Sequence, residues 1–288
     1  MSRPCFDMRG AVVAITGGTG GLGNATAREL LSRGAKVAVL DVHPDTARIA
    51  AQMSPESAIG VVADVRDRAS LDRAVTEIVE RFGAIDVAIA NAGILGRTAT
   101  LRTTPIEAIQ SVFAVNVTGV VNTVHACMGQ ILGTRGQFVL ISSVFAFING
   151  MGAIPYAMSK SAVEQLGRGL QVELAPHNVS TTIAYFSLID TDMVKHGVDD
   201  DPLADDLRSA IPKPLLKRIT PAAAAAALAD GITIRAPHVT TPTRWRPVSA
   251  LRGALAPALD PRLARNPRLQ AALTALDARI DTAVKGTP

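Results

Sequence analysis

The first 185 residues alternate short, wholly apolar runs with longer stretches of helical periodicity. Apolar runs of four to eight residues without polar alternation are typical of strands that are buried on both faces of a parallel sheet. Six such strands are expected, at 11–18, 35–41, 58–64, 84–93, 136–143 and 178–186. Helices are expected at 24–34, 67–82, 104–132 and 155–175. The pattern predicts an α/β fold whose parallel sheet is covered by helices on both faces.

The pattern loosens after residue 190. The stretch 198–207 is acidic, 221–232 predicts a helix, and 236–245 is the best candidate for a short seventh strand. We therefore expect a Rossmann-type, doubly wound sheet of about seven strands in a catalytic domain at 1–239. Residues 240–288, which are rich in proline and arginine, are expected to form a helical C-terminal extension.

A glycine-rich turn, "ITGGTGGLGNATA", lies between the first expected strand and the first expected helix. A chain that turns here presents free N–H groups and the positive end of a helix dipole, and glycine lets a pyrophosphate approach closely. A flexible turn is the alternative, but the position between strand and helix favours the phosphate site. A nucleoside-triphosphate loop is not expected, because the Gly-Lys-Ser/Thr sequence is missing. The expected cofactor contacts are Gly17, Thr19, Gly21, Leu22 and Gly23.

Further cofactor contacts are expected where the next three strands end. Asp41 follows Gly23 by 18 residues, at a position where a carboxylate can bind the adenosine ribose diol. This carboxylate would repel a 2′-phosphate, so NAD is favoured over NADP. Asp64 can accept a hydrogen bond from the adenine amino group, and a simple loop role is the alternative. The other contacts expected here are Val65, Asn91, Ala92 and Gly93.

A tyrosine precedes a lysine by one helical turn next to a strongly apolar stretch. Pro155 suits the first turn of a helix and would place Tyr156 and Lys160 on one face. A free phenol has a pKa near ~10, which a neighbouring ammonium and an oxidised nicotinamide are expected to lower. Ser143, at the end of the fifth strand, would hydrogen-bond the substrate oxygen. Taken singly, Tyr156 could be a packing residue and Lys160 a solvated helix residue.

These motifs together resemble the short-chain dehydrogenase/reductase superfamily in its compact single-domain form. The turn "TGGTGGLG" matches the Thr-Gly-x-x-x-Gly-x-Gly motif of the family, and "NAG" at 91–93 matches its sheet-stabilising motif. The sequences "NVTG" at 116–119 and "YAMSK" at 156–160 match its catalytic segments. Ser143 lies 13 residues before Tyr156, which is the family spacing.

The resemblance implies a role for each matching residue. Tyr156 would be the general acid/base, Lys160 would tune it and hold the nicotinamide ribose, and Ser143 would orient the substrate oxygen. Asn116 would anchor a water relay behind Lys160, although a polar residue that bonds a backbone carbonyl is the structural alternative. Thr191 would hydrogen-bond the nicotinamide carboxamide.

The chain departs from the family pattern in two places. Phe186 and Ser187 stand where members usually carry Pro-Gly, which either reshapes the pocket wall or replaces one turn by another. The usual C-terminal strand ending in Asp-Gly-Gly is missing, so the tetramer contacts of that ending are in doubt. A homodimer or homotetramer is still expected, with the helices at 104–132 and 155–175 as the interface.

Composition and charge exclude several classes of protein. The chain of 288 residues has only two cysteines, Cys5 and Cys127, which suit reduced thiols of a cytoplasmic protein and predict no disulfide or metal site. We expect no signal peptide and no membrane span. The net charge is +4, but residues 240–288 carry eight basic and three acidic side chains, so the basic excess belongs to the tail. Basic patches with exposed aromatics are missing, so no nucleic-acid partner is expected.

The tail allows two interpretations. Its helical face contains Leu269, Leu273, Leu276 and Ile280, with Trp245 and several arginines nearby. The favoured interpretation is an extension that packs over the substrate cleft or a partner subunit. The alternative is a basic amphipathic segment in peripheral contact with an anionic membrane.

The sequence therefore predicts an NAD-dependent oxidoreductase that acts on a small alcohol or carbonyl compound. A lipophilic substrate is expected, because the pocket candidates are the apolar residues Val144, Phe145, Phe147, Met151, Leu188 and Met193. The alternatives are an NAD-using epimerase or dehydratase, and a cofactor-sensing binding protein without turnover. An intact Ser143, Tyr156 and Lys160 argues against the binding protein.

Overall fold

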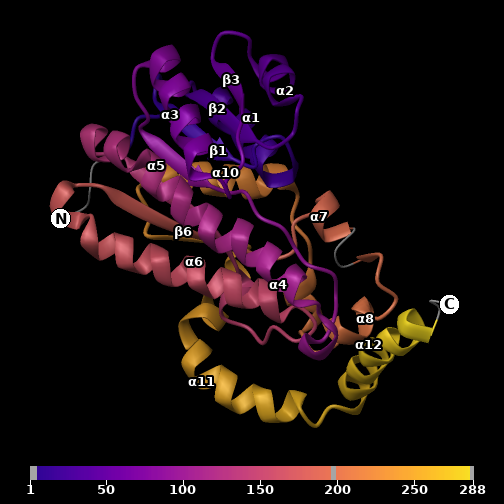
Figure 1. Cartoon of the computed structure of the whole chain (residues 1–288). Helices are drawn as coiled ribbons and strands as arrows, with labels where there is room; N and C mark the ends of the chain where they lie inside the picture. The colour runs from indigo at the N-terminus through magenta and orange to yellow at the C-terminus, as the bar shows by residue number, and fades with distance from the viewer. Residues whose placement is uncertain (1–4, 196–198, 286–288) are drawn as a thin grey trace.

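Across residues 5–195 and 199–285, the part of the chain that the computed structural model describes, seven parallel strands form one sheet (Figure 1). Its order is β3-β2-β1-β4-β5-β6-β7, so the direction of winding reverses between β1 and β4. The register is continuous, because Val13 lies opposite both Val37 and Val87. The strands are β1 (Val12–Thr16), β2 (Lys36–Asp41), β3 (Ala58–Val62), β4 (Val87–Ala90), β5 (Gln137–Ser143), β6 (Ser180–Phe186) and β7 (His238–Thr241).

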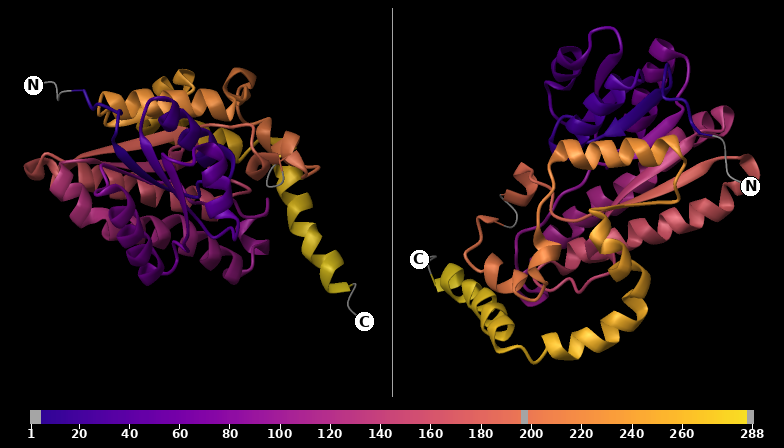
Figure 2. Two further views of the ribbon diagram at one scale, coloured as in Figure 1. Left: turned by 90° about the horizontal axis from the view of Figure 1, so that it is seen from above. Right: turned by 180° about the vertical axis from the view of Figure 1, so that it is seen from behind.

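Helices cover both faces of this sheet, as the pattern predicts (Figure 2). One face carries α3 (Arg68–Phe82), α5 (Gly119–Thr134) and α6 (Ile154–Glu173). The opposite face carries α1 (Gly21–Ser32), α2 (Thr46–Met53) and α10 (Pro221–Thr233). Short one-turn elements complete this part: η1 (Leu101–Thr103), η3 (Val144–Ala146) and η4 (Ala175–His177).

Alternate residues of each strand enter two separate cores, because successive side chains of a strand point to opposite faces. Val13 and Ile15 of β1 pack toward α1 and α10, where Leu30 and Leu228 are fully buried. Val12 and Ala14 pack toward α3, α5 and α6. The continuous apolar runs in the sequence thus reflect burial on both faces.

A long apolar helical stretch, Ile106–Thr134, corrects one expectation from the sequence. It consists of α4 (Ile106–Phe113), a wider π-helical turn η2 (Ala114–Thr118) and α5. By length and hydropathy alone it is the one described helix that could cross a membrane, although no such stretch was expected. Val120, Val124, Cys127 and Ile131 of α5 are buried against the sheet, which accounts for the apolar composition within this fold.

Beyond β6 the chain forms shorter helices and then leaves the sheet. The first are α7 (Asp192–Val194), α8 (Ala204–Arg208) and α9 (Lys213–Leu216). After β7 and η6 (Thr243–Trp245) come α11 (Arg246–Leu263) and α12 (Pro267–Lys285), which we call the C-terminal arm. The arm curves beneath α6 and returns toward α8 (Figure 1). Because β7 extends to Thr241, the expected boundary at 239 falls inside the last strand, and a separate unit at 240–288 stays a prediction.

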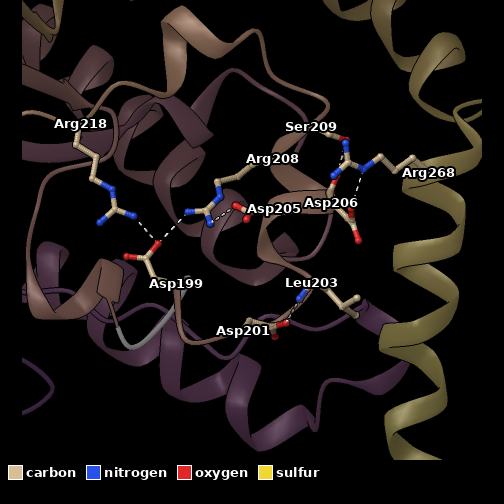
Figure 3. Close-up of polar contacts among 9 residues, drawn as sticks. All are labelled: Asp199, Asp201, Leu203, Asp205, Asp206, Arg208, Ser209, Arg218 and Arg268. Atoms are coloured by element: carbon tan, nitrogen blue, oxygen red, sulfur yellow. Dashed lines mark hydrogen bonds and ion pairs between the residues drawn. The ribbon is translucent and has the colours of Figure 1, made fainter.

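The C-terminal arm is attached by a few apolar side chains and by ion pairs. Leu269, Ala272 and Leu276 of α12 are buried where this helix packs against α8 and η1. Arg268 reaches Asp206, so that two helices distant in sequence are joined (Figure 3). Further contacts join Arg279 to Asp201, Arg102 to Asp277 and Arg252 to Glu164.

The apolar side chains proposed for membrane contact are used within the chain. Trp245 is buried, with its ring centre 6.3 Å from that of Phe147. Leu269 and Leu276 are buried and Leu273 is half-buried, whereas the side chain of Ile280 lies outside the described residues. The arrangement of α12 agrees with an extension that packs over the cleft.

Candidate active site

A cavity of about 630 Å³ opens at the carboxyl ends of β1 and β4, where the winding of the sheet reverses. Ligands of open α/β sheets bind at this place. The structure brings all but one of the expected site residues to this cavity, and the exception is Asn116. The residues brought together are Gly17, Thr19, Gly21, Leu22, Gly23, Asp41, Asp64, Val65, Asn91, Ala92, Gly93, Ser143, Tyr156, Lys160 and Thr191.

The glycine turn lies so close to β4 that side chains are excluded. A Cβ on Gly23 would be 2.1 Å from the carbonyl oxygen of Gly17 and 2.8 Å from Nδ2 of Asn91. That Nδ2 donates to the carbonyl oxygens of Thr16 and Gly17 at 2.9 and 3.0 Å, which fixes the turn against the end of β4. Gly17 also has a φ of +63°, which favours glycine. The turn leads into the N-terminus of α1, where backbone N–H groups can bind an anion.

Asp41 is held to the glycine turn by hydrogen bonds. Its Oδ2 accepts from the backbone N–H and the hydroxyl of Thr19 at 3.1 and 2.7 Å, and its Oδ1 accepts from the N–H of His43 at 3.3 Å. These bonds orient the carboxylate at the end of β2, on the wall of the cleft. A ribose diol at this wall would find an acceptor already in place.

Asp64 faces a cation that the sequence analysis overlooked. Arg66 also lines the cleft, and its Nη2 lies 2.6 Å from Oδ2 of Asp64. The side-chain hydrogen bond from Arg66 holds the pKa of Asp64 below its usual value. The Arg66 guanidinium is therefore already bonded to the carboxylate that was expected to bind adenine. The adenine contact stays a prediction.

Asn116 lies behind the cleft, within η2, and its amide is fully used by the protein. Oδ1 accepts from the N–H of Ile94 at 2.8 Å, and Nδ2 donates to the carbonyl oxygen of Ile94 at 2.9 Å and to the hydroxyl of Ser159 at 3.0 Å. The residue thus joins the loop after β4 to α6. This arrangement agrees with the structural alternative of a bond to a backbone carbonyl, while the water relay stays a prediction.

Tyr156 and Lys160 lie one helical turn apart on α6, whose first turn contains Pro155. The Nζ of Lys160 is 5.5 Å from the centre of the Tyr156 ring and donates to the carbonyl oxygen of Ile141 at 2.9 Å. Ser143 comes from the end of β5, and its hydroxyl donates to the carbonyl oxygen of Phe186 at 3.2 Å. All three side chains line the same cavity.

The protonation of this pair corrects the expectation of an acidified phenol. Burial raises the pKa of Tyr156 to about 12, and interaction with the Ser143 hydroxyl opposes this shift only in part. Burial lowers the pKa of Lys160 to about 8. In the protein alone, desolvation outweighs the effect of the lysine, because the ammonium is directed to a backbone carbonyl, and the lowering expected from an oxidised nicotinamide stays a prediction. At neutral pH the phenol therefore carries its proton and can donate it.

The family pattern has Pro-Gly where this chain has Phe186 and Ser187, at the end of β6. Phe186 is the last residue of β6, and its side chain is buried in the core toward α1 and α10. The N–H of Ser187 donates to the carbonyl oxygen of Thr241 at 3.2 Å, which keeps the chain beside β7. Phe186 therefore ends β6, and both residues line the cleft.

The substrate side of Tyr156 agrees only in part with the apolar wall that was expected, because Met193 is the one of the six candidates that lines the cleft. Phe145 packs edge-on against Tyr156, and Phe147 packs against Trp245 in the interior. A second cavity beside Tyr156, of about 170 Å³, is lined instead by the loop after β4 and by α12. Leu276 was expected on a helix that packs over the cleft, whereas Arg97 and Arg279 were not expected at this cavity. The apolar face of the tail was the signal for Leu276, whereas no local pattern indicates that Arg97 and Arg279 meet at this cavity.

Comparisons with known proteins identify the family of this chain. The family profile of the short chain dehydrogenases matches residues 11–202. The 2-(R)-hydroxypropyl-CoM dehydrogenase of Xanthobacter autotrophicus is 34% identical over 209 residues, which are 70% of this chain and 84% of that protein. The cis-2,3-dihydrobiphenyl-2,3-diol dehydrogenase of Paraburkholderia xenovorans is 34% identical over 71% of this chain and 78% of its own length. The 2,3-dihydro-2,3-dihydroxybenzoate dehydrogenase of Bacillus subtilis is 32% identical over 65% and 72%.

Solved structures show the same fold. A 3-ketoacyl-(acyl-carrier-protein) reductase from Brucella melitensis, complexed with NADH, superposes with a TM-score of 0.73 at 23% identity and covers 81% of this chain and 97% of its own. A short-chain type dehydrogenase/reductase from Mycobacterium marinum superposes with a TM-score of 0.72 at 27% identity, over 82% and 95%. Because the family profile matches more than half of the chain, the chain belongs to the short-chain dehydrogenase family and is an oxidoreductase.

Proposed function

We propose that the protein is an NAD-dependent dehydrogenase that interconverts an alcohol and the corresponding carbonyl compound. The observation that carries this proposal is one cavity lined by the glycine turn, by Asp41, and by Ser143, Tyr156 and Lys160. Relatives that share about a third of their sequence are named as dehydrogenases of hydroxylated compounds, which supports the same chemistry here.

The residues present fit a dinucleotide. The turn from Gly17 to Gly23 would hold the pyrophosphate at the N-terminus of α1, because Gly23 leaves no side chain in the way. Asp41 would bind the adenosine ribose and exclude a 2′-phosphate. Arg66 offers no free positive charge to such a phosphate, because Asp64 neutralises it. NAD is therefore the proposed cofactor in preference to NADP.

The catalytic side chains would move one proton at the substrate oxygen. A bound nicotinamide supplies the hydride donor or acceptor and, when oxidised, a positive charge beside the phenol. In reduction, Tyr156 donates its proton to the carbonyl oxygen, and a pKa of about 12 keeps that proton in place at neutral pH. In oxidation, the phenolate of Tyr156 would accept the proton, and the positive charge of the oxidised cofactor would oppose the desolvation that raises the pKa of this phenol. The Ser143 hydroxyl donates to the same substrate oxygen and stabilises its charge.

Tyr156→Phe tests this proposal. Turnover should fall by a factor of about 100 or more, because general acid–base catalysis contributes at least that much, while NADH binding should be nearly unchanged. The assay follows the absorbance of the reduced cofactor with a panel of alcohols and ketones, using NAD and NADP in parallel. Unaltered turnover would contradict the role of Tyr156, and a clear NADP preference would contradict the role of Asp41.

A further inference from the structure

The cavity of about 170 Å³ beside Tyr156 has an unusual charge distribution. Its described lining residues include two arginines, Arg97 and Arg279, and no carboxylate. The other lining residues are apolar or carry hydroxyl groups. Among them, Pro155 comes from α6 and Leu276 from α12. An arginine pair in a small cavity provides a site for an anion, because guanidinium groups bind oxyanions with two parallel hydrogen bonds.

Arg97 is the guanidinium that is available to a ligand. It lies in the loop that follows β4, and its side chain is exposed. Among the described residues, no carboxylate lies within ion-pair distance of it. At longer range, the positive charge of Arg97 contributes to lowering the pKa of Asp201. An anion in the cavity would give Arg97 a direct partner.

Arg279 is held in a fixed position by the protein. Its Nη1 and Nη2 contact the two carboxylate oxygens of Asp201 at 2.6 and 2.7 Å. Asp201 is itself oriented by the N–H of Leu203, which donates to it at 2.9 Å. Leu276, one turn earlier on α12, is buried and anchors the helix beside the cavity. Asp201 offsets the charge of Arg279, as Asp64 does for Arg66, so Arg279 forms a fixed part of the cavity wall while Arg97 supplies the charge for the anion.

A neighbouring cavity provides an internal contrast. This cavity, of about 640 Å³, shares Arg97 and Arg279 with the smaller one, but Asp192, Asp200 and Asp201 also line it. Three carboxylates oppose the binding of an anion there. The smaller cavity, which Tyr156 lines, is thus the electrostatically favoured position.

We propose that Arg97, with Arg279 beside it, binds a compact oxyanion such as a carboxylate on the substrate. The preferred substrates are then acidic alcohols and the corresponding keto or oxo acids, in place of neutral lipophilic alcohols. The claim that the anion is part of a substrate rests on the proposed function, whereas the existence of the anion site does not. Because one small cavity contains both Tyr156 and the arginines, the anionic group lies near the reacting carbon.

The binding of benzoate and benzamide tests the anion site directly, because the two molecules have nearly the same shape and differ in charge. Calorimetry with the full chain, with and without NADH, should show benzoate binding about tenfold or more tightly, as expected for a hydrogen-bonded charge pair. Arg97→Gln should abolish the preference, and Arg97→Lys should retain part of it. Arg97 is exposed, so these variants should fold normally.

Arg102→Gln is the matched control. Arg102 lies near Arg97 in sequence, but its guanidinium pairs with Asp277 and does not line the cavity. This variant should keep the preference for benzoate. Equal binding of the two molecules by the native chain would overturn the inference, and so would an equal loss in Arg97→Gln and Arg102→Gln.

Turnover separates the two proposals. If no alcohol is oxidised with NAD or NADP, the proposed function fails, and the benzoate experiment still decides whether the anion site exists. If acidic and neutral alcohols are oxidised with equal efficiency, and Arg97→Gln changes neither, the specificity inference fails while the dehydrogenase proposal stands.

Discussion

The two walls of the cleft are constructed in different ways. The wall formed by the glycine turn and β4 consists of fully buried strands, and its backbones approach so closely that Gly23 leaves no room for a Cβ. The wall formed by the C-terminal arm depends on a few buried side chains of α12 and on ion pairs near the surface, and no described residue of α11 is buried. The first wall should therefore be rigid and little affected by salt, whereas the second should respond to salt and pH.

The largest effect should follow from a methyl group in the rigid wall. In Gly23→Ala the Cβ would lie 2.1 Å from the Gly17 carbonyl oxygen, so the turn must shift. We expect a loss of about 1–3 kcal/mol in the free energy of unfolding, as for other overpacked sites, together with loss of NADH binding. Urea unfolding and NADH titration measure the two effects.

Gly20→Ala serves as the stability control in the same turn. Gly20 has a φ of −115°, and a Cβ there would meet nothing within 4 Å. Its free energy of unfolding should match that of the native chain. Similar losses in both variants would show that the close approach of the two backbones is not the cause.

A buried charge on α6 should give the next effect. Burial lowers the pKa of Lys160 to about 8 from 10.5, so the folded state is penalised wherever the unfolded chain is protonated. Lys160→Met removes this penalty but also the bond to the Ile141 carbonyl, so the variant should be about 1–2 kcal/mol more stable at pH 7.

The pH dependence checks the sign of that prediction. Below pH 8 both states of the native chain are protonated and the full penalty applies. Between pH 8 and 10.5 the folded state has lost the proton that the unfolded state retains, so the native chain gains stability relative to Lys160→Met. Urea unfolding of both proteins at pH 7 and pH 10 measures this change. A difference in stability that is independent of pH would refute the assignment of a buried, destabilising ammonium.

The smallest effect on overall stability should come from the arm. Asp201→Asn breaks the two-point contact with Arg279, which is partly exposed, so we expect a loss of about 1 kcal/mol or less. Amide hydrogen exchange should nevertheless accelerate in α12 and leave β1 and β4 unchanged. High salt should weaken the same attachment in the native chain.

Acid, like high salt, should weaken the attachment of the C-terminal arm. Arg279 holds the pKa of Asp201 below its usual value, so the contact is fully present above the unfolded carboxyl value and is lost as the pH falls through the lower folded value. Arg268→Gln, which removes a more exposed pair, should change α12 less. Equal acceleration of exchange in α12 and in the sheet would mean that the arm is not a separately attached region.

The rigid wall was also the part that the sequence predicted best. Strands that are buried on both faces leave continuous apolar runs, and six of them were located correctly. Helix α2 was overlooked, because Thr46–Met53 is short and only two of its residues are buried. Helix α1 begins at Gly21, earlier than its periodicity indicated, because glycines conceal the first turn.

The arm could not be predicted to the same extent. Its helices and apolar face were visible, but the contact of Arg279 with Asp201 joins positions 78 residues apart and leaves no local signal. The pKa of Tyr156 was misjudged for a related reason. Spacing along α6 indicates that two side chains share a face, but it does not show how deeply the fold removes them from water.

Asn116 connects the loop after β4 to α6, and this connection can couple two parts of the cleft. Its single amide bonds Ile94, in the loop that leads to Arg97, and Ser159, the neighbour of Lys160 on α6. Displacement of that loop by an arriving anion would be transmitted through Asn116 to Ser159, which is next to Lys160 on α6. Occupancy of one half of the cleft should thus change the affinity of the other half, and the effect must be equal in both directions.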